Sequence, residues 1–138
     1  MGIFKKKRKI TRKDMKAFRK AQQGELDAVL MYEKLAKSVR RKGDKETFER
    51  LSKDEQRHAD VFFAFTKDED MKPKKAKSIA VPLLTKFLGR RIVYRVIAKA
   101  EYDAEKNYEP LVKKYPEVES VKNDEHHHGD AVLALIEK

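Results

Sequence analysis

The feature that most restricts the fold of this chain is an internal repeat. The segment ELDAVLMYEKL at residues 25–35 and the segment EYDAEKNYEPL at residues 101–111 share the pattern Glu-x-Asp-Ala-x-x-x-Tyr-Glu-x-Leu. Each is followed by an Asp-Glu-x-x-His stretch, DEQRH at 54–58 and DEHHH at 124–128, and all 4 histidines lie in these two stretches. Because two segments recur in the same order, the chain is predicted to be two hairpins of one design.

The hairpins are predicted to be helical. Apolar residues recur at three- and four-residue spacing in four stretches, about 12–42, 45–66, 90–114 and 117–136. Gly43 is expected to end the first helix and Asp44 to cap the second. The 66–89 connection, with a short apolar segment ending near Gly89, is long enough to run the length of a bundle. The predicted fold class is therefore all-α, an antiparallel four-helix bundle with one long crossover connection.

Acidic and imidazole side chains interrupt the apolar stripes of all four helices. Glu55 and His58 are three residues apart, as are Glu125 and His128, so each pair projects from one helix face. Glu25 and Glu101 occupy the same kind of position on the first and third helices. The interior of the bundle would thus receive four carboxylates and two imidazoles.

So many buried carboxylates need a counter-charge, because an unpaired buried charge is costly. Two divalent cations would balance the four glutamates, and each ion would also receive one histidine. Carboxylate with some imidazole suits iron or manganese and lacks the thiolates of structural zinc sites. The alternative is a duplicated hairpin whose acids pair with Lys or Arg, but no basic residue lies on the same stripes. The predicted metal ligands are Glu25, Glu55, His58, Glu101, Glu125 and His128.

Four further residues near the predicted site need interpretation. Tyr32 and Tyr108 each follow a first-segment glutamate by seven residues, on the same face. They are either core residues whose hydroxyl bonds a site carboxylate or partners that position the metal ligands, and both roles are compatible. His126 and His127 face away from the direction of His128 and are predicted to lie on the surface.

The motifs GELDAVLMY, LSKDEQRHADVFFAF, KAEYDAEKNYEPL and NDEHHHGDAVLAL resemble the helices of the ferritin-like superfamily, and within it the rubrerythrin and erythrin-type di-iron domains. The resemblance covers roughly residues 15–137. It implies two iron ions, with manganese as the alternative, and chemistry with O₂ or peroxide. Rubrerythrins carry a further glutamate at the position of Ala104, and Glu105 is expected to point elsewhere. The rubredoxin domain of rubrerythrin, which needs cysteine, is missing because the chain has no Cys.

The basic residues are concentrated at one end of the chain. The net charge is +11, and ten of the first twenty residues are Lys or Arg. Residues 1–10 are predicted to form a flexible tail outside a bundle at 11–138. The tail is either a solvated segment or a contact for an anionic partner, such as nucleic acid or lipid.

The expected function is a non-haem di-iron protein that oxidises Fe(II) or reduces peroxide or O₂, in iron handling or oxidative-stress defence. An external electron donor would be required for a reductase. Two alternatives are a non-catalytic iron-delivery module that docks through its basic N-terminus, and a basic DNA-protecting ferritin relative. The absence of cysteine and of a long apolar run suggests a cytoplasmic protein without a transmembrane segment. A homo-oligomer, most simply a dimer, is also expected.

Overall fold

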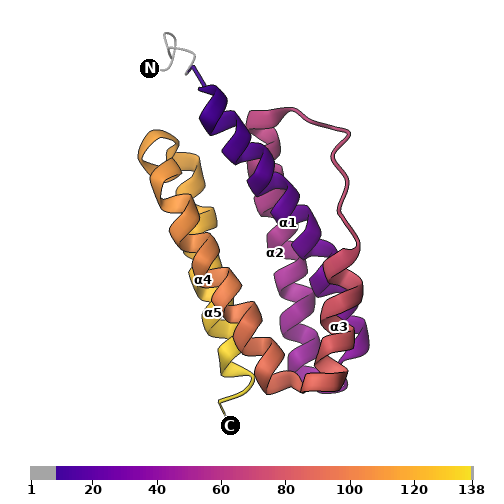
Figure 1. The fold of residues 1–138 in the computed structure, drawn as a ribbon. Coiled ribbons are helices and arrows are strands. Elements are labelled where there is room, and N and C mark those ends of the chain that lie inside the picture. Colours follow the sequence, from indigo (N-terminus) through magenta and orange to yellow (C-terminus); the bar gives the residue numbers. More distant parts are fainter. Residues whose placement is uncertain (1–8, 138) are drawn as a thin grey trace.

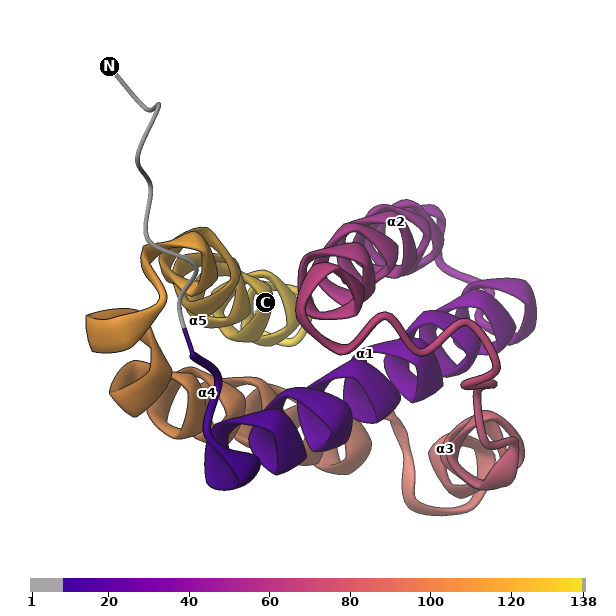
Figure 2. The same cartoon turned by 90° about the horizontal axis from the view of Figure 1, so that it is seen from above.

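The computed structural model describes residues 9–137, which form two helical hairpins joined by a long crossover (Figure 1). The elements are α1 (Arg12–Ser38), α2 (Lys42–Thr66), α3 (Ala76–Leu88), α4 (Arg90–Lys114), a 3₁₀ turn η2 (Pro116–Val118) and α5 (Glu119–Ala134). α1 packs on α2 and α4 on α5, while α3 contacts both α1 and α4. Viewed from above, α1 lies beside α4 and α2 beside α5, with α3 outside the four-helix square (Figure 2). The predicted fold class is confirmed.

The corner between α1 and α2 differs from the sequence-based expectation. α1 ends at Ser38, the chain is extended at Val39 and Arg41, and α2 begins at Lys42. Gly43 and Asp44 therefore lie in the first turn of α2, and the expected stop and cap are wrong. Asp44 is buried and has a tertiary role that the local pattern did not reveal.

Asp44 ties the two hairpins together. Its carboxylate accepts hydrogen bonds from Tyr94 Oη at 2.7 Å and from Arg90 Nε and Nη2 at 3.1 and 3.0 Å. Arg90 Nη2 also donates to the carbonyl of Leu135. The start of α2, the start of α4 and the end of α5 are thereby joined at one end of the bundle.

Other helix boundaries follow the sequence closely. Thr11 caps α1 by accepting a hydrogen bond from the Asp14 amide at 3.0 Å, as Ser and Thr commonly do at this position. Gly89 separates α3 from α4 with φ +87°, a conformation that favours glycine. The predicted tail, residues 1–10, lies almost wholly outside the described residues. None of the helices in residues 9–137 combines the length and apolar character needed to cross a bilayer.

Two apolar clusters fill the interior, one toward each end of the bundle. One is built on Phe18, Phe62 and Val121, and the other on Tyr32, Leu35 and Phe48 with residues of α4 and α5. Between them the same helices carry buried glutamate and histidine side chains. The core thus has a polar layer at mid-height, and this layer is the candidate site.

Candidate metal centre

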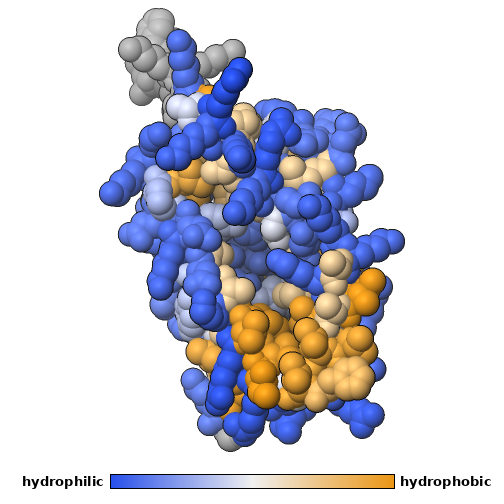
Figure 3. All heavy atoms as spheres, in the orientation of Figure 1, coloured by the Kyte–Doolittle hydropathy of each residue, from blue (hydrophilic) through white to orange (hydrophobic). Residues whose placement is uncertain are grey.

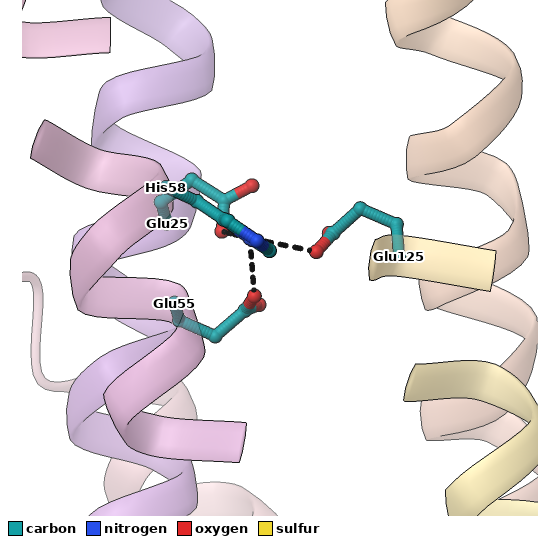
Figure 4. A group of neighbouring side chains, drawn as sticks. All are labelled: Glu25, Glu55, His58 and Glu125. Atoms are coloured by element: carbon teal, nitrogen blue, oxygen red, sulfur yellow. Dashed lines mark hydrogen bonds and ion pairs between the residues drawn. The ribbon is translucent and has the colours of Figure 1, made fainter. Parts of the chain in front are cut away.

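All six predicted ligands meet in the polar layer. Each helix of the four-helix square contributes at least one: α1 supplies one glutamate, α4 another, and α2 and α5 one glutamate and one histidine each. Their side chains are almost completely buried, with at most 6% of any residue exposed. They are Glu25, Glu55, His58, Glu101, Glu125 and His128. Figure 4 shows one half of the site, where His58 points between Glu25 and Glu55 of its own hairpin and Glu125 of the other.

The six residues form two overlapping groups. Glu25, His58 and the two glutamates Glu55 and Glu125 offer ligand atoms within 4.8 Å of one another, and Glu101 and His128 do the same with the same two glutamates. Glu55 and Glu125 belong to both groups. This arrangement follows the pseudo-twofold repeat of the sequence, and it suits two cations bridged by two shared carboxylates.

Each histidine presents its Nδ1 atom to the centre of the site. His58 Nδ1 lies 2.9 Å from Glu55 Oε1 and 3.0 Å from Glu125 Oε1. Its Nε2 lies 2.8 Å from Asp124 Oδ2. His128 has the same orientation, with Nε2 at 2.9 Å from Asp54 Oδ2. An aspartate that accepts the Nε2 proton leaves the Nδ1 lone pair free for a metal ion.

Asp54 and Asp124 are functional candidates that the sequence interpretation missed. Each precedes a site glutamate by one residue, and each contacts the histidine of the opposite hairpin. Arg57 donates to Asp54 at 2.7 Å and lies 3.5 Å from Asp124, so one cation serves both carboxylates. The repeated Asp-Glu dipeptide was the available signal, because the aspartate recurs together with the ligand.

The two tyrosines hold the outer glutamates. Tyr108 Oη donates to Glu25 Oε1 at 2.8 Å, and Tyr32 Oη donates to Glu101 Oε1 at 2.6 Å. Burial and the neighbouring carboxylates raise the pKa of both phenols well above the usual value, so the hydroxyls remain protonated donors. In each glutamate the tyrosine occupies Oε1 and leaves Oε2 directed into the site.

Several buried atoms of the site lack a well-formed hydrogen bond to the described residues. Within residues 9–137, no hydrogen bond of good geometry reaches Glu25 Oε2, Glu101 Oε2, Glu125 Oε1 or His128 Nδ1, although the imidazole nitrogens and carboxylate oxygens of the site lie close together, as His58 Nδ1 and Glu125 Oε1 do at 3.0 Å. Buried polar atoms are nearly always paired in folded proteins. Three anionic oxygens and an imidazole nitrogen, all directed to one place, are the donor set of a carboxylate-rich iron or manganese site. The residues present therefore fit a bound metal pair.

The electrostatics of the metal-free site show how strongly these charges interact. Burial raises the pKa of Glu25 and Glu55, and like-charged neighbours raise both further. Burial also raises the pKa of Glu101 to about 7. Although burial opposes ionisation of Glu125, the facing histidines lower its pKa to about 2.

In the metal-free site, bound protons supply the positive charge that metal cations would otherwise supply. Burial opposes protonation of His58 and His128, but the surrounding carboxylates outweigh it and raise the pKa of both imidazoles well above the usual value. The site therefore holds positive charge as histidinium when metal is not bound. Metal ions would displace these protons, which links metal binding to pH.

The residues expected to lie outside the site do so. His126 and His127 are exposed, and His126 Nδ1 lies 3.0 Å from Glu105 Oε1 on the outer face of α4 and α5. Within residues 9–137, no Lys or Arg forms an ion pair with any of the four site glutamates. The alternative in which Lys or Arg neutralises the buried acids therefore has no support in the described residues.

A pocket of about 470 Å³ reaches the site. Its walls come mainly from α1 and α4, including Gly24, Ala28, Ala100 and Ala104, and it extends to all four site glutamates. Small side chains thus leave open space beside the outer glutamates. Ala104, at the position where rubrerythrins have a further glutamate, lines this pocket and adds no carboxylate.

Comparison with known proteins adds one finding. The sequence model of the family described as Rubrerythrin matches residues 16–136, which include every residue of the site. Comparisons with curated proteins and with solved structures gave no match.

Proposed function

This chain belongs to the rubrerythrin family, and from that premise we propose that it is a non-haem di-iron protein that oxidises Fe(II) or reduces peroxide or O₂. Carboxylate and imidazole donors accept manganese as well as iron, so a manganese-containing centre is a variant of the same proposal. The family and the buried carboxylate–histidine cluster support metal binding, and the particular redox reaction is the proposed part.

One observation carries the proposal. Two glutamates are shared between two groups of ligand atoms, and each group has its own histidine and its own outer glutamate. A single structural cation would not need duplicated histidines and outer glutamates. Two Fe(II) ions bound by these residues would supply two electrons, one from each ion, which is the number needed to reduce peroxide to water or O₂ to peroxide.

The protein groups around the cluster have separate tasks. Asp54 and Asp124 hold the histidines with Nδ1 inward, and Tyr32 and Tyr108 hold the outer glutamates with Oε2 inward. Fixed donors lower the reorganisation that a change in metal charge would otherwise demand. The pocket between α1 and α4 gives a small oxidant access to the cluster, while the apolar clusters above and below exclude bulk water.

Stopped-flow absorption tests the redox proposal. The protein is loaded anaerobically with two equivalents of Fe(II) and mixed with O₂ or with hydrogen peroxide, and Fe(III) formation is followed in the near ultraviolet. We expect oxidation at least about tenfold faster than for free Fe(II) with one of the two oxidants. Glu49→Ala, an exposed change on α2, is the matched control for Glu125→Ala, which should abolish the acceleration.

The same experiment separates the proposal from the non-catalytic alternative. A chain that binds two Fe(II) ions but oxidises them no faster than free Fe(II), with either oxidant, would be an iron-delivery module. Comparing the two oxidants also distinguishes a ferroxidase from a peroxide reductase, since each predicts a different preferred oxidant.

A further inference from the structure

A continuous apolar surface covers α3 and the first turns of α4. Figure 3 shows it as a patch at the lower right of the molecule, in the orientation of Figure 1. All the exposed large hydrophobic side chains of the described residues belong to it, and Phe87 (78% exposed), Ile79 (66%) and Val96 (63%) are the most open. We call these residues the α3–α4 patch: Ile79, Leu83, Leu84, Phe87, Leu88, Ile92 and Val96.

The helix α3 differs from an ordinary surface helix because most of its large apolar side chains are exposed. Its inward face carries the buried Ser78, together with Thr85 and Val81, which packs on the apolar core. The Ser78 hydroxyl donates to the carbonyl of Lys75, just before α3, and the Thr85 hydroxyl donates to the carbonyl of Val81. Its outward face carries leucine, isoleucine and phenylalanine. A surface helix normally places its apolar stripe against the core. The outer face of α3 therefore exposes large apolar side chains that a partner could cover.

Lysines border this apolar face on both sides. At roughly 100° per residue, the apolar arc of α3 runs from Ile79 through Phe87 to Leu88. Lys75 and Lys86 then lie beside Ile79 at one edge of the arc, and Lys77 lies beside Leu88 at the other. All three lysines are exposed, and their aliphatic stems can cover apolar surface while the ammonium groups reach outward.

The segment that contains α3 and the first turns of α4 carries only positive charge. Residues 71–100 contain nine Lys or Arg and no Asp or Glu. Arg90 pairs with Asp44 and Lys99 with Asp103. Lys75, Lys77, Lys86 and Arg95 form no ion pair with any residue in the described part of the chain. The patch is therefore an apolar surface with a cationic border.

An apolar surface with a cationic border favours one kind of partner. A second copy of the chain, docked by the same patch about a twofold axis, would bring the lysines of both copies together without an acid from residues 71–100 to pair them. A bilayer with anionic headgroups accepts apolar side chains at the level of the acyl boundary and ammonium groups at the level of the phosphates. We propose that the α3–α4 patch docks the protein on the surface of an anionic phospholipid membrane.

Docking in this orientation has a consequence for the metal centre. Lys77, Val81 and Val96 also line the 470 Å³ pocket that reaches Glu25 and Glu101. Val96 belongs to the patch as well, so the patch adjoins the wall of the pocket. A membrane-docked molecule would hold this side of the pocket close to the lipid surface.

Vesicle sedimentation with the full-length chain tests the proposal. We expect binding to vesicles of phosphatidylcholine with one-third phosphatidylglycerol, little binding to phosphatidylcholine alone, and weaker binding as salt is raised. The double variant Leu83→Ser/Phe87→Ser changes two exposed side chains and should fold normally, as circular dichroism would verify. It should lower the vesicle partition coefficient by roughly tenfold or more, since two large apolar side chains lose their contact with lipid.

Charge reversal provides a matched pair of variants. Lys75→Glu/Lys86→Glu should lower vesicle binding by at least about tenfold, because each cation near an anionic surface contributes several-fold in affinity. Lys53→Glu/Lys113→Glu changes the net charge equally at exposed sites on α2 and α4, outside the patch. This control should stay within roughly threefold of the unmodified chain, since only distant charge changes.

Three results would overturn the proposal. The first is a full-length chain that does not bind anionic vesicles. The second is patch variants that bind like the unmodified chain while deletion of residues 1–10 abolishes binding, which would assign the interaction to the N-terminal segment. The third is a dimer in light scattering that Leu83→Ser/Phe87→Ser converts to a monomer without any vesicle binding, which would make the patch an interface between copies.

Discussion

Each outer glutamate and each histidine of the site is held by a residue of the opposite hairpin. Tyr108 bonds Glu25 and Tyr32 bonds Glu101, while the two histidines bond the aspartates that precede the shared glutamates. The ligand geometry of one hairpin is therefore set by the other. At the scale of single residues, the site is a feature of the paired hairpins and of neither one alone.

The aspartates that orient the histidines offer the first prediction. In Asp124→Ala the Nε2 atom of His58 loses its acceptor, so the ring is free to rotate and Nδ1 is a poorer ligand. We expect metal affinity to fall roughly 10- to 100-fold, measured by competition with a chromophoric chelator. Asp54→Ala should have the same effect through His128. Asp60→Ala, an exposed change on α2, is the control, and an affinity for Asp124→Ala equal to that of the control would refute the assigned role.

The raised pKa values of the site predict how stability depends on pH without metal. The pKa of Glu101 is about 7 in the folded chain, above its usual value of 4.5. Between pH 4.5 and pH 7 the folded state therefore binds more protons than the unfolded state. Proton binding stabilises the folded state at low pH, and this contribution to the free energy of unfolding is lost as the pH rises. One such carboxyl corresponds to about 2 kcal/mol between pH 5.5 and pH 8. The raised pKa values of His58 and His128 act in the same direction.

Urea unfolding measures this dependence. The unfolding midpoint of metal-free protein should be lower at pH 8 than at pH 5.5. Saturating Mn(II) or anaerobic Fe(II) should raise the midpoint at pH 8, because metal replaces the lost protons and binds only the folded state. A metal-free midpoint that rises with pH, or one that metal leaves unchanged, would show that other protein groups already neutralise the buried acids.

At the scale of elements, the ring of Tyr102 on α4 packs directly against the backbone of Gly129 on α5. A Cβ atom added there would lie 2.5 Å from Cε1 of Tyr102, whose hydroxyl bonds Asp130 on the same helix as Gly129. Gly129→Ala should therefore push the ring out and destabilise the fold by about 1–3 kcal/mol. Gly43→Ala, in open space in the first turn of α2, should instead be neutral or stabilise by up to about 1 kcal/mol.

Chemical denaturation of the two glycine variants under one set of conditions checks the contrast. Both changes add one methyl group to a helical glycine, so helix propensity alone favours both equally. Opposite signs of the stability change would identify the close packing of α4 on α5. Equal stabilisation by both alanines would mean that Tyr102 moves aside freely.

The helices were predictable from the sequence to different degrees. The bounds of α4 were obtained because Gly89 precedes it and Pro116 follows Lys114, and both act locally. The corner between α1 and α2 was misplaced because Gly43 was interpreted as a stop signal, although it has ordinary helical backbone. What fixes that corner is the burial of Asp44 against Arg90 and Tyr94, about fifty residues away in the chain. Such long-range contacts leave no local pattern.

In the site too, features set by the local sequence were predictable and features set by long-range contacts were not. Glutamate and histidine three residues apart on one apolar stripe identify inward-facing donors, so the six candidate ligands were accessible from periodicity and from the repeat. Asp54 and Asp124 lie next to that stripe, and their contacts with the histidines depend on how α2 and α5 face each other. The exposed apolar face of α3 was not predicted either, because the pattern of this short segment does not show how little of its apolar surface the bundle covers.

At the scale of the whole molecule, the repeat, the buried charge and the pairing of the hairpins have one common explanation. Two hairpins of one design meet about a pseudo-twofold axis, and Glu55 and Glu125 are the residues that belong to both halves of the polar layer. Four carboxylates at the junction are compatible with a folded chain only if cations, or protons in their place, neutralise them. The central claim is therefore that this layer binds two metal ions.

Metal content per chain tests this claim most directly. The unmodified protein, reconstituted anaerobically with Fe(II) and freed of excess metal, should contain about two ions per chain by elemental analysis. Glu55→Ala and Glu125→Ala each remove a carboxylate that belongs to both groups of ligand atoms. Both variants should therefore fold but contain clearly fewer than two ions, whereas the exposed change Glu49→Ala should keep two. If Glu55→Ala and Glu125→Ala both still bound two ions with unchanged affinity, the polar layer would not be a dinuclear metal centre.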